Sequence, residues 1–341
     1  MNLRELSDHL GLSQATVSRA LNGYREIRAE TRARVVEAAE KYGYRPNSHA
    51  RNLATGRART LAMVFTLGTG LPLDPHFLEF LVGVSEWASV NDLSINLSTP
   101  DASREEATYR HIVRTGLADG FIVNGPRVDD PRPGWLKSLR APYVVHGSTE
   151  PAAPDSCVDI DNEGAFARAT AHLLDLGHRR IALLNGPGHY VFAAHRELGF
   201  RRACAARGVP VDPSLLFATE MTEEQGFLLG RRALAASPRP TAFLCASLIL
   251  ALGLLRALAD AGLSTPRDCS IIAHDDVFPF VNPASLRPAL TTTRSPIREH
   301  GRHVAELLNR KIEASTPFEA HEMIAVDLVL RESTGPAPRL V

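Results

Sequence analysis

Residues 11–22 combine a bend, a helix cap and an amphipathic helix in one short stretch. Gly11 permits a tight bend, and the hydroxyl of Ser13 can accept a free backbone N–H in the first turn of the helix that follows. Val17 and Leu21 fall on one face of that helix, so the polar side chains between them face outward. The stretch therefore predicts a short helix that packs by one face and presents a polar face to a partner.

The flanking residues supply the apolar positions that this helix needs for packing. Leucines recur at spacings of three and four before the bend, and a later helix offers matching positions. The expected core residues are Leu3, Leu6, Leu10, Val17, Leu21, Val35 and Ala39. We expect three short helices around one small core. The outward side chains of the second helix suit base edges and phosphate oxygens, so this helix is predicted to be the recognition helix of a DNA-binding head.

The charge distribution agrees with a DNA-binding N-terminus. The chain has 341 residues and a formal net charge of zero, which suits two or three domains. Residues 1–59 nevertheless carry 11 Lys and Arg against 6 Asp and Glu. Because Arg-rich composition pervades the chain, the position of this excess matters more than the number of arginines. Nucleic acid would bind at the basic end.

Several classes of protein are disfavoured by missing motifs. Cys157, Cys204, Cys245 and Cys269 lack Cys-x-x-Cys or His-ligand spacing, which argues against a zinc site and a disulfide framework. No apolar run approaches the roughly 20 residues of a membrane span, and the N-terminus begins with helix signals, so we expect a cytoplasmic protein. The dinucleotide fingerprint, phosphate loop and nucleophile elbow are also missing, so we expect neither an enzyme nor a cofactor.

Beyond residue 59, short apolar strands alternate with amphipathic helices, which is typical of parallel α/β layers. Strands are expected at 61–67, 93–97, 120–123, 143–145, 181–184, 242–245 and 270–273. Helices are expected at 77–90, 104–115, 164–176, 196–207, 224–236 and 249–261. Two such runs in tandem predict two lobes that face a cleft, with the ligand beside the C-terminal ends of the strands.

Specific phrases of the chain resemble the lactose repressor (LacI/GalR) family. They are Thr16-Val17-Ser18-Arg19, Tyr44-Arg45-Pro46-Asn47, and residues 118–123, 176–181, 196–200, 275–276, 290–293 and 331–334. The resemblance covers essentially the entire chain. It implies an α/β protein with an N-terminal three-helix helix-turn-helix head and a hinge helix. A two-lobed core of two parallel sheets, similar to periplasmic binding proteins, is implied to follow.

The resemblance also implies domain boundaries. The head is expected at 1–45 and the hinge helix or linker at 46–58. The N-lobe would span 59–158, completed by about 291–321, and the C-lobe 159–290, completed by about 322–341. The chain would cross between the lobes near 157–161, 290–294 and 319–323. No heptad tail follows, which implies a homodimer on a palindromic operator.

The DNA-binding residues implied by the resemblance fall in the head and the hinge. The positions matching base-reading residues of the major groove are Gln14, Ala15 and Arg19. Further DNA contacts are implied for Thr16, Ser18, Asn22, Thr31 and Asn47. Leu53 matches a leucine that wedges into the minor groove, and Ala50 allows two hinge helices to approach. A solvated linker is the alternative. Arg28 stands where the family often has a serine helix cap.

An effector site in the cleft is implied in the same way. Arg196 and Asp275 match the polar anchors of the family, with a structural salt bridge as the alternative for each. The other expected pocket residues are Asp74, His76, Phe77, Asn124, Phe192 and Met221, with Phe77 as the stacking platform. The chain departs from the family at Ser247 and His146, where Asn-Asp and Asp-Arg are more usual, but Ser247 could still hydrogen-bond a hydroxyl of the effector. His146 could be a ligand contact, a pH-sensitive gate or a satisfied core histidine.

Together, these features favour a dimeric repressor of a sugar-utilisation operon that is released from double-stranded DNA by a small sugar. An α-glucoside or another disaccharide is the favoured effector. Two alternatives stay open: a corepressor-dependent regulator with a purine-like ligand, and a sugar-binding receptor without a DNA function.

Overall fold

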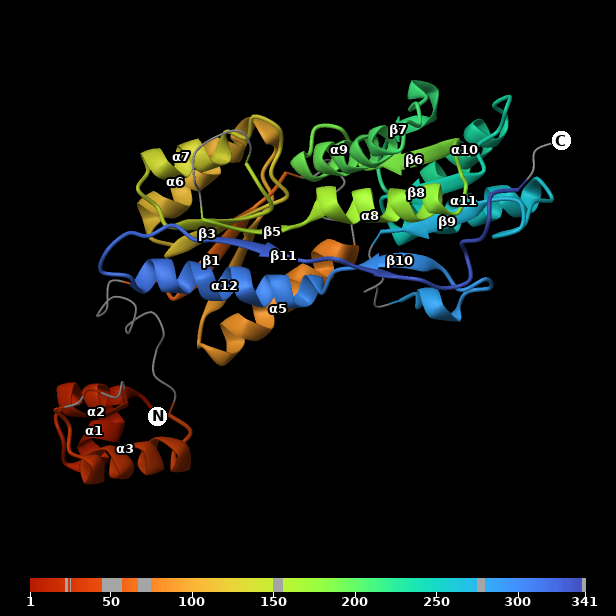
Figure 1. Ribbon diagram of the computed structural model, residues 1–341. Helices are drawn as coiled ribbons and strands as arrows, with labels where there is room; N and C mark the ends of the chain where they lie inside the picture. The colour runs from red at the N-terminus through yellow and green to blue at the C-terminus, as the bar shows by residue number, and fades with distance from the viewer. Residues whose placement is uncertain are drawn as a thin grey trace. The chain divides into compact units, whose positions relative to one another are not determined.

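The computed structural model describes residues 1–21, 24, 26–44, 57–66, 75–149, 156–274 and 280–338 (Figure 1). They belong to two compact units, Met1–Arg59 and Thr60–Val341. Six of the expected site residues lie outside the described residues: Asn22, Asn47, Ala50, Leu53, Asp74 and Asp275.

The described part of the N-terminal unit holds three helices. They are α1 (Leu3–Leu10), α2 (Gln14–Leu21) and α3 (Ala29–Lys41). Leu6, Val17 and Val35 are fully buried between them. Gly11 ends α1 with φ 65°, and the Oγ of Ser13 accepts the Thr16 N–H at 3.1 Å, as the sequence predicted. Arg28 begins α3 without a side-chain cap.

The described residues of the second unit form two six-stranded sheets. The first, wholly parallel, has the order β11-β5-β4-β3-β1-β2. Its strands are β1 (Thr60–Val64), β2 (Ser94–Ser98), β3 (Gly120–Asn124), β4 (Tyr143–His146), β5 (Cys157–Ile160) and β11 (His321–Ile324). The second sheet has the order β12-β10-β9-β8-β6-β7, with one antiparallel pair, β10 and β12. Its strands are β6 (Ile181–Asn185), β7 (Leu216–Ala218), β8 (Ala242–Cys245), β9 (Ser270–Ala273), β10 (Thr291–Arg294) and β12 (Asp327–Val329).

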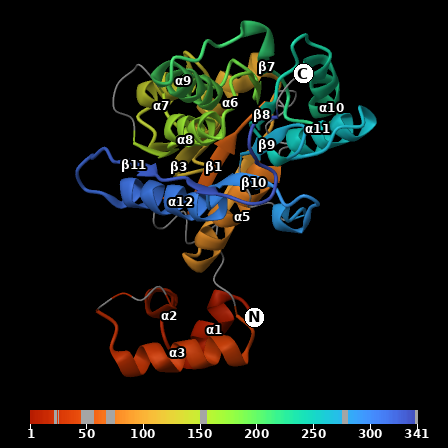
Figure 2. The ribbon, with the colours of Figure 1, turned by 45° about the vertical axis from the view of Figure 1, so that its right-hand side comes forward.

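Helices cover both faces of the first sheet (Figures 1 and 2). Leu61 and Met63 of β1 pack in the cluster with α5 (Pro75–Val90) and α12 (Ile297–Glu313). Ala62 and Val64 pack in the opposite cluster with α6 (Glu105–Thr115) and α7 (Arg132–Ser138). Because successive side chains of a strand point to opposite faces, a strand buried on both faces is an unbroken apolar run, which is the pattern that the sequence shows.

The helices of the second sheet are α8 (Asn162–Asp175), α9 (Val191–Ala206), α10 (Glu223–Leu234) and α11 (Leu248–Asp260). Short 3-10 turns occur at η2 (Ala102–Arg104), η3 (Pro213–Leu215) and η4 (Pro283–Ser285). This arrangement confirms the predicted α/β class and its two mainly parallel sheets.

Glycines bring α5 and α12 into backbone contact under the first sheet. A Cβ atom built on Gly83 would lie 1.9 Å from the carbonyl oxygen of Arg298. A Cβ atom on Gly301 would lie 2.2 Å from the carbonyl oxygen of Phe80. No side chain fits at either position, so the two helices are fixed at this separation.

Within the described residues, the chain passes between the two sheets three times: between β5 and α8, between β10 and α12, and between β11 and β12. The N-lobe was expected to resume at about residue 291. The second passage comes after Arg294, because β10 pairs with β9 of the second sheet. The third comes after Ile324, because β11 pairs with β5 of the first sheet.

Candidate functional site

A cavity lies between the two lobes and includes about 820 Å³ of space, part of it open to solvent. The N-lobe contributes His76, Phe77, Phe80, Asn124, Gly125, Pro126 and His146. The C-lobe contributes Val191, Phe192, His195, Arg196, Met221, Ala246 and His274, and Asp159, Ile160 and Asn162 come from the first passage. These residues gather at the carboxyl ends of the parallel strands, where open α/β sheets bind ligands.

The structure brings most of the described effector candidates together. Those that line the cavity are His76, Phe77, Asn124, His146, Phe192, Arg196 and Met221. Ser247 is not among the lining residues, because its Oγ accepts the Leu250 N–H at 3.2 Å and caps the start of α11. The cavity lining therefore does not support the predicted contact between Ser247 and the effector.

Arg196 is the most constrained charged side chain of the cavity. It projects from α9 and is 7% exposed. Its Nε donates to Oδ1 of Asn162 at 2.8 Å, and its Nη1 donates to the carbonyl oxygen of Ala246 at 3.1 Å. The guanidinium also lies 4.6 Å from the ring centroid of Phe192. These contacts hold a buried positive charge in one position beside an aromatic face.

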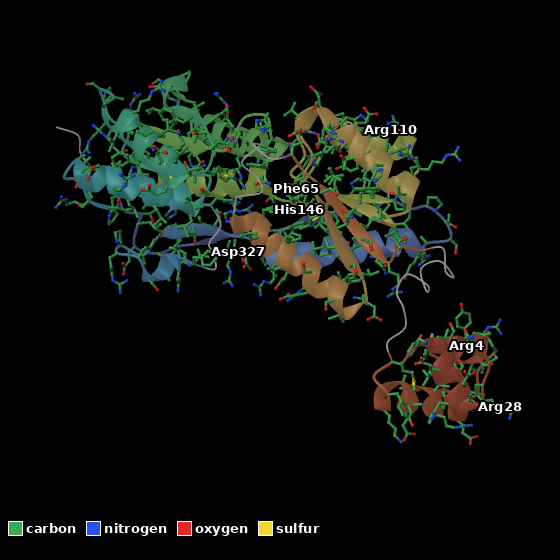
Figure 3. All side chains as sticks on the ribbon, turned by 180° about the vertical axis from the view of Figure 1, so that it is seen from behind. Arg4, Arg28, Phe65, Arg110, His146 and Asp327 are labelled. Carbon is green, nitrogen blue, oxygen red and sulfur yellow. The ribbon has the colours of Figure 1, made fainter. Side chains whose placement is uncertain are left out.

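His146, labelled in Figure 3, ends β4 of the first sheet. It lines the cavity from the N-lobe. Its Nδ1 lies 2.7 Å from Oδ1 of Asn124, and its ring stacks on Phe80 at 4.3 Å between centroids. Burial, with a smaller contribution from His300, lowers the pKa of His146 to about 3. The ring is therefore neutral at pH 7. Because Oδ1 of Asn124 can only accept, Nδ1 carries the proton and Nε2 offers a lone pair.

Nε2 of His146 is buried and has no hydrogen-bond partner within the part of the chain that the structure describes. Buried polar atoms are nearly always paired, so an unpaired acceptor beside a cavity indicates a place for a donor from a ligand or a water molecule. Of the three interpretations of His146 from the sequence, the neutral ring disfavours a gate that titrates near pH 7.

Sequence reasoning missed Asp159 and Asn162 as cavity residues. Asn162 anchors Arg196, and Asp159, 5% exposed, accepts the Ile160 N–H at 2.7 Å. A signal existed, since three polar residues, Asp159, Asp161 and Asn162, stand in or directly after the strand β5. Phe80 was also missed, although it lies one helical turn after His76 on α5.

The head presents its base-reading candidates to solvent. Gln14, Ala15 and Arg19 are exposed on α2. The partly exposed candidates are Thr16, Ser18 and Thr31. Val17 and Ala20 of the same helix are buried in the core, so the polar face of α2 points away from it, as expected.

The described residues lack two features. None of their helices is both long and apolar enough to span a membrane. They also contain no group of three or more His, Cys, Asp or Glu side chains placed to hold a metal ion.

Comparisons with known proteins extend over the whole chain. The family described as bacterial regulatory proteins, lacI family, matches residues 2–47, and the periplasmic binding protein-like domain matches residues 170–334. The HTH-type transcriptional regulator AglR of Rhizobium meliloti is 44% identical over 339 residues, which cover 99% of this chain and 95% of that protein. CelR of Thermobifida fusca is 31% identical over 326 residues, which cover 95% of each.

Solved structures of transcriptional regulators have a similar fold. A complex of the transcriptional regulator CelR with cellobiose has a TM-score of 0.73 and 29% identity, covering 97% of this chain and 99% of that one. The lac repressor dimer bound to operator and the anti-inducer ONPF has a TM-score of 0.83, covering 98% of this chain and 99% of that one. Its identity of 24% shows a shared fold alone.

Half-buried His146 and buried His300 make stability depend on pH. Burial lowers the pKa of His146 to about 3 and that of His300 to about 4. The unfolded chain binds protons at these rings from about pH 6.5 downward, whereas the folded chain does not. Protonation of these rings therefore does not lower the free energy of unfolding above about pH 6.5. That free energy decreases as the pH falls toward 4. At pH 5.5 each ring should cost about 1.4 kcal/mol of the free energy of unfolding, measured by urea titration of the core transition.

A substitution isolates the contribution of His146. His146→Gln should reduce the loss of unfolding free energy between pH 7.5 and 5.5 by about 1.4 kcal/mol, whatever its effect at pH 7.5. His111→Gln, at an exposed position of α6, is the matched control. An undiminished pH dependence in His146→Gln would show that this ring is not buried in its neutral form.

Proposed function

Because the chain belongs to the LacI family of bacterial regulatory proteins, we propose that it is a dimeric transcriptional repressor that a sugar releases from a palindromic operator. The head at 1–45 would bind operator DNA, with a hinge at 46–58 leading to the two-lobed core. Operator binding would place the protein with the DNA, in the cytoplasm. The observation that carries the effector role is the cavity between the lobes, where a buried guanidinium, an unpaired acceptor and aromatic faces converge.

The chemistry of the cavity favours a sugar. A sugar presents hydroxyl groups that donate and accept, together with apolar ring faces. Arg196 supplies hydrogen-bond donors, and Nε2 of His146 supplies an acceptor. Phe77 and Phe192 line the same space and offer surfaces for a ring. The solved complex of CelR with cellobiose shows that a protein of this fold, 29% identical, holds a disaccharide, which supports the same ligand class here.

The proposed mechanism is a two-state switch. A sugar that contacts both lobes favours their closed arrangement, because its bonds to the two lobes form together only there. Closure would rotate the N-lobes of the dimer, separate the hinge helices and withdraw Leu53 from the minor groove. Coupling of this kind is typically about 1–3 kcal/mol, enough to weaken operator binding roughly five- to 150-fold.

An apolar groove along α5 supports the homodimer. It is lined by residues of α5, among them Leu78, Leu81, Val82 and Val90, and by Phe280, which follows β9 of the C-lobe. Leu78 is 45% exposed, Val90 85% and Phe280 76%. Exposed apolar surface of this kind commonly marks a protein interface, and the lac repressor of the same fold was solved as a dimer. We infer that a second copy of the chain covers this groove.

Sugar binding tests the effector proposal. In a thermal-shift panel of glucose, maltose, sucrose, trehalose, cellobiose, adenine and hypoxanthine, a disaccharide should raise the melting temperature. Arg196→Ala should abolish that shift and weaken calorimetric binding at least about 30-fold, because a charge-assisted donor in a buried site is lost. Arg201→Ala is the control, since Arg201 lies on the same helix but pairs with Glu197 at the surface. A shift by the purines alone would favour the corepressor alternative, and a full shift in Arg196→Ala would place the site elsewhere.

Operator binding tests the role of α2. Arg19→Ala should weaken binding to an operator selected from random DNA by about five- to 150-fold, the worth of one bidentate base contact. Binding to unrelated DNA should change little, as measured by fluorescence anisotropy at fixed salt. Arg34→Ala, at an exposed position of α3, serves as the control. Equal losses on operator and unrelated DNA would assign Arg19 to phosphate contact instead of base reading.

The dimer is tested at the apolar groove. Leu78→Glu should weaken self-association at least tenfold in sedimentation equilibrium, because a charge would be buried against apolar side chains. Leu228→Glu changes a leucine that is equally exposed on α10 and should leave association unchanged. A dimer that persists in Leu78→Glu would rule out this face as the interface.

A further inference from the structure

A loop of the N-lobe makes direct backbone bonds to the C-lobe beside the cavity. The loop, residues 125–131, follows β3, and its partner segment, residues 189–191, follows β6 and ends on the first residue of α9. The Val128 N–H donates to the carbonyl oxygen of His189 at 2.9 Å, and the Val191 N–H donates to the carbonyl oxygen of Pro126 at 3.1 Å. These bonds form an antiparallel bridge centred on Arg127 and Tyr190. The two lobes are therefore joined here without a covalent crossing.

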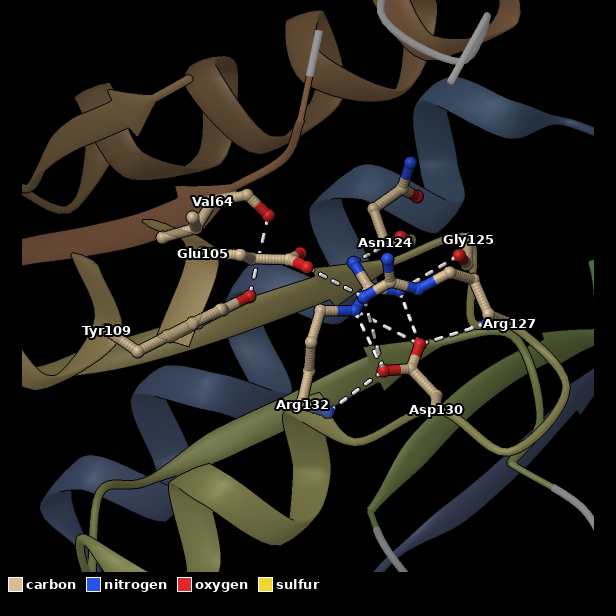
Figure 4. A network of polar contacts seen from close by, with 8 residues as sticks. All are labelled: Val64, Glu105, Tyr109, Asn124, Gly125, Arg127, Asp130 and Arg132. Atoms are coloured by element: carbon tan, nitrogen blue, oxygen red, sulfur yellow. Dashed lines mark hydrogen bonds and ion pairs between the residues drawn. The ribbon is translucent and has the colours of Figure 1, made fainter. Parts of the chain in front are cut away.

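A charged cluster behind the loop fixes its conformation (Figure 4). The buried carboxylate of Asp130 accepts the backbone N–H groups of Arg127 and Arg132, both at 2.9 Å, and pairs with the Arg132 guanidinium at 2.6 Å. Burial opposes ionisation, but the bonds and charge of Arg132 lower the pKa of Asp130 below its ordinary value. Arg132 also donates to the carbonyl oxygens of Asn124 and Gly125 at 3.3 and 3.0 Å.

The same cluster anchors the loop to the body of the N-lobe. Arg127 pairs with Glu105 of α6 at 2.8 Å, and Glu105 is buried. Asp129 takes the left-handed backbone conformation at φ 56°, which costs energy unless neighbouring contacts hold it. The hydrogen bonds of Asp130 supply those contacts. These contacts within the N-lobe therefore fix the loop so that the Pro126 carbonyl and the Val128 N–H face the C-lobe.

The bridge also touches the effector site. Gly125 and Pro126 of the loop and Val191 of the partner segment line the cavity. Tyr190 stacks on Phe192 at 5.3 Å, and Phe192 lies under the Arg196 guanidinium. A change in the bridge would therefore reach the side chains proposed to hold the sugar.

The bridge lies away from the covalent crossings. The crossing strands β5 and β11 are at one edge of the first sheet, and β10 and β12 are at one edge of the second. The bridge follows β3 and β6, which lie farther into each sheet. When two lobes rotate about a hinge, the points farther from it separate more, so bonds there oppose opening most effectively.

We propose that residues 125–131 form an interlobe latch, in which Asp130 and Arg132 position the Val128 N–H and the Pro126 carbonyl so that the lobes are held closed on the effector. The latch thereby sets the sugar concentration at which the lobes stay closed. This inference rests on the proposed sugar response of the cleft. Asp130 and Arg132 are positioning residues that act through the loop without touching the ligand.

Removal of one donor tests the latch. Val128→Pro deletes the N–H that bonds to His189, while Val128→Ala keeps it and trims a side chain that is 49% exposed. In the full chain, Val128→Pro should weaken calorimetric binding of the disaccharide found in the panel by about fivefold, the worth of one backbone hydrogen bond. Val128→Ala should stay within twofold. Equal affinities in the two variants would overturn the proposal.

A double substitution separates positioning from general stability. Asp130→Asn should weaken sugar binding in the wild-type background and have a smaller effect in Val128→Pro, because the two changes share the Val128 contact. Additive losses would show that Asp130 acts elsewhere. If Val128→Pro does not fold, Asp130→Asn replaces it in these measurements, with Asp129→Asn, at an exposed position of the same loop, as the control.

Hydrogen exchange supplies a readout without a ligand. The peptide spanning 187–195 should exchange faster in Val128→Pro than in Val128→Ala, because the Val191 N–H loses protection when the bridge opens. If no sugar in the panel binds but this difference appears, the sugar proposal fails and the latch stands. If sugar binds and exchange is identical in both variants, the latch is refuted and the effector site stands.

Discussion

Burial of both faces of the first sheet confines its polar chemistry to the ends of the strands. Alternate residues of β1 enter two different apolar clusters, so a charged side chain within such a strand would face hydrocarbon on either side. Polar groups are tolerated where the strands stop and loops begin. The carboxyl ends of the strands from both lobes meet around one cavity, and the candidate site follows from that constraint.

The polar groups at this site are held by one another. Arg196 is fixed by Asn162 and a backbone carbonyl, and His146 is fixed by Asn124 and by stacking on Phe80. Such pairing keeps charged and polar groups in place before a ligand arrives, which reduces the ordering cost of binding. Within the described residues, Nε2 of His146 has no hydrogen-bond partner, and a ligand hydroxyl could complete such a position.

The sequence predicted the parts of the fold that depend on local signals. The bend at Gly11, the cap at Ser13 and the apolar strands carry their own patterns, and the structure confirms them. The edge strands β11 and β12 were not expected, because they are short, partly exposed and lack an apolar run. Ser247 shows a second limit: a serine before an apolar helix is equally a cap and a hydroxyl donor, and only the packed structure decides. Asp159 was not predicted as a cavity residue, because its neighbours Asp161 and Asn162 suit a turn, whereas the structure places Asp159 within β5.

The glycine contacts between α5 and α12 restrict how this cleft could acquire another ligand. Gly83 and Gly301 leave no room for a β-carbon, so the separation of the two helices cannot be adjusted by small steps of substitution. His76, Phe77 and Phe80 line the cavity from α5, and Ile297 lines it from α12. Adaptation to a larger or smaller molecule would therefore proceed by substitution of these side chains, while the separation of α5 and α12 stays the same. Such substitutions change which ligand groups the cavity binds more readily than they change its overall dimensions.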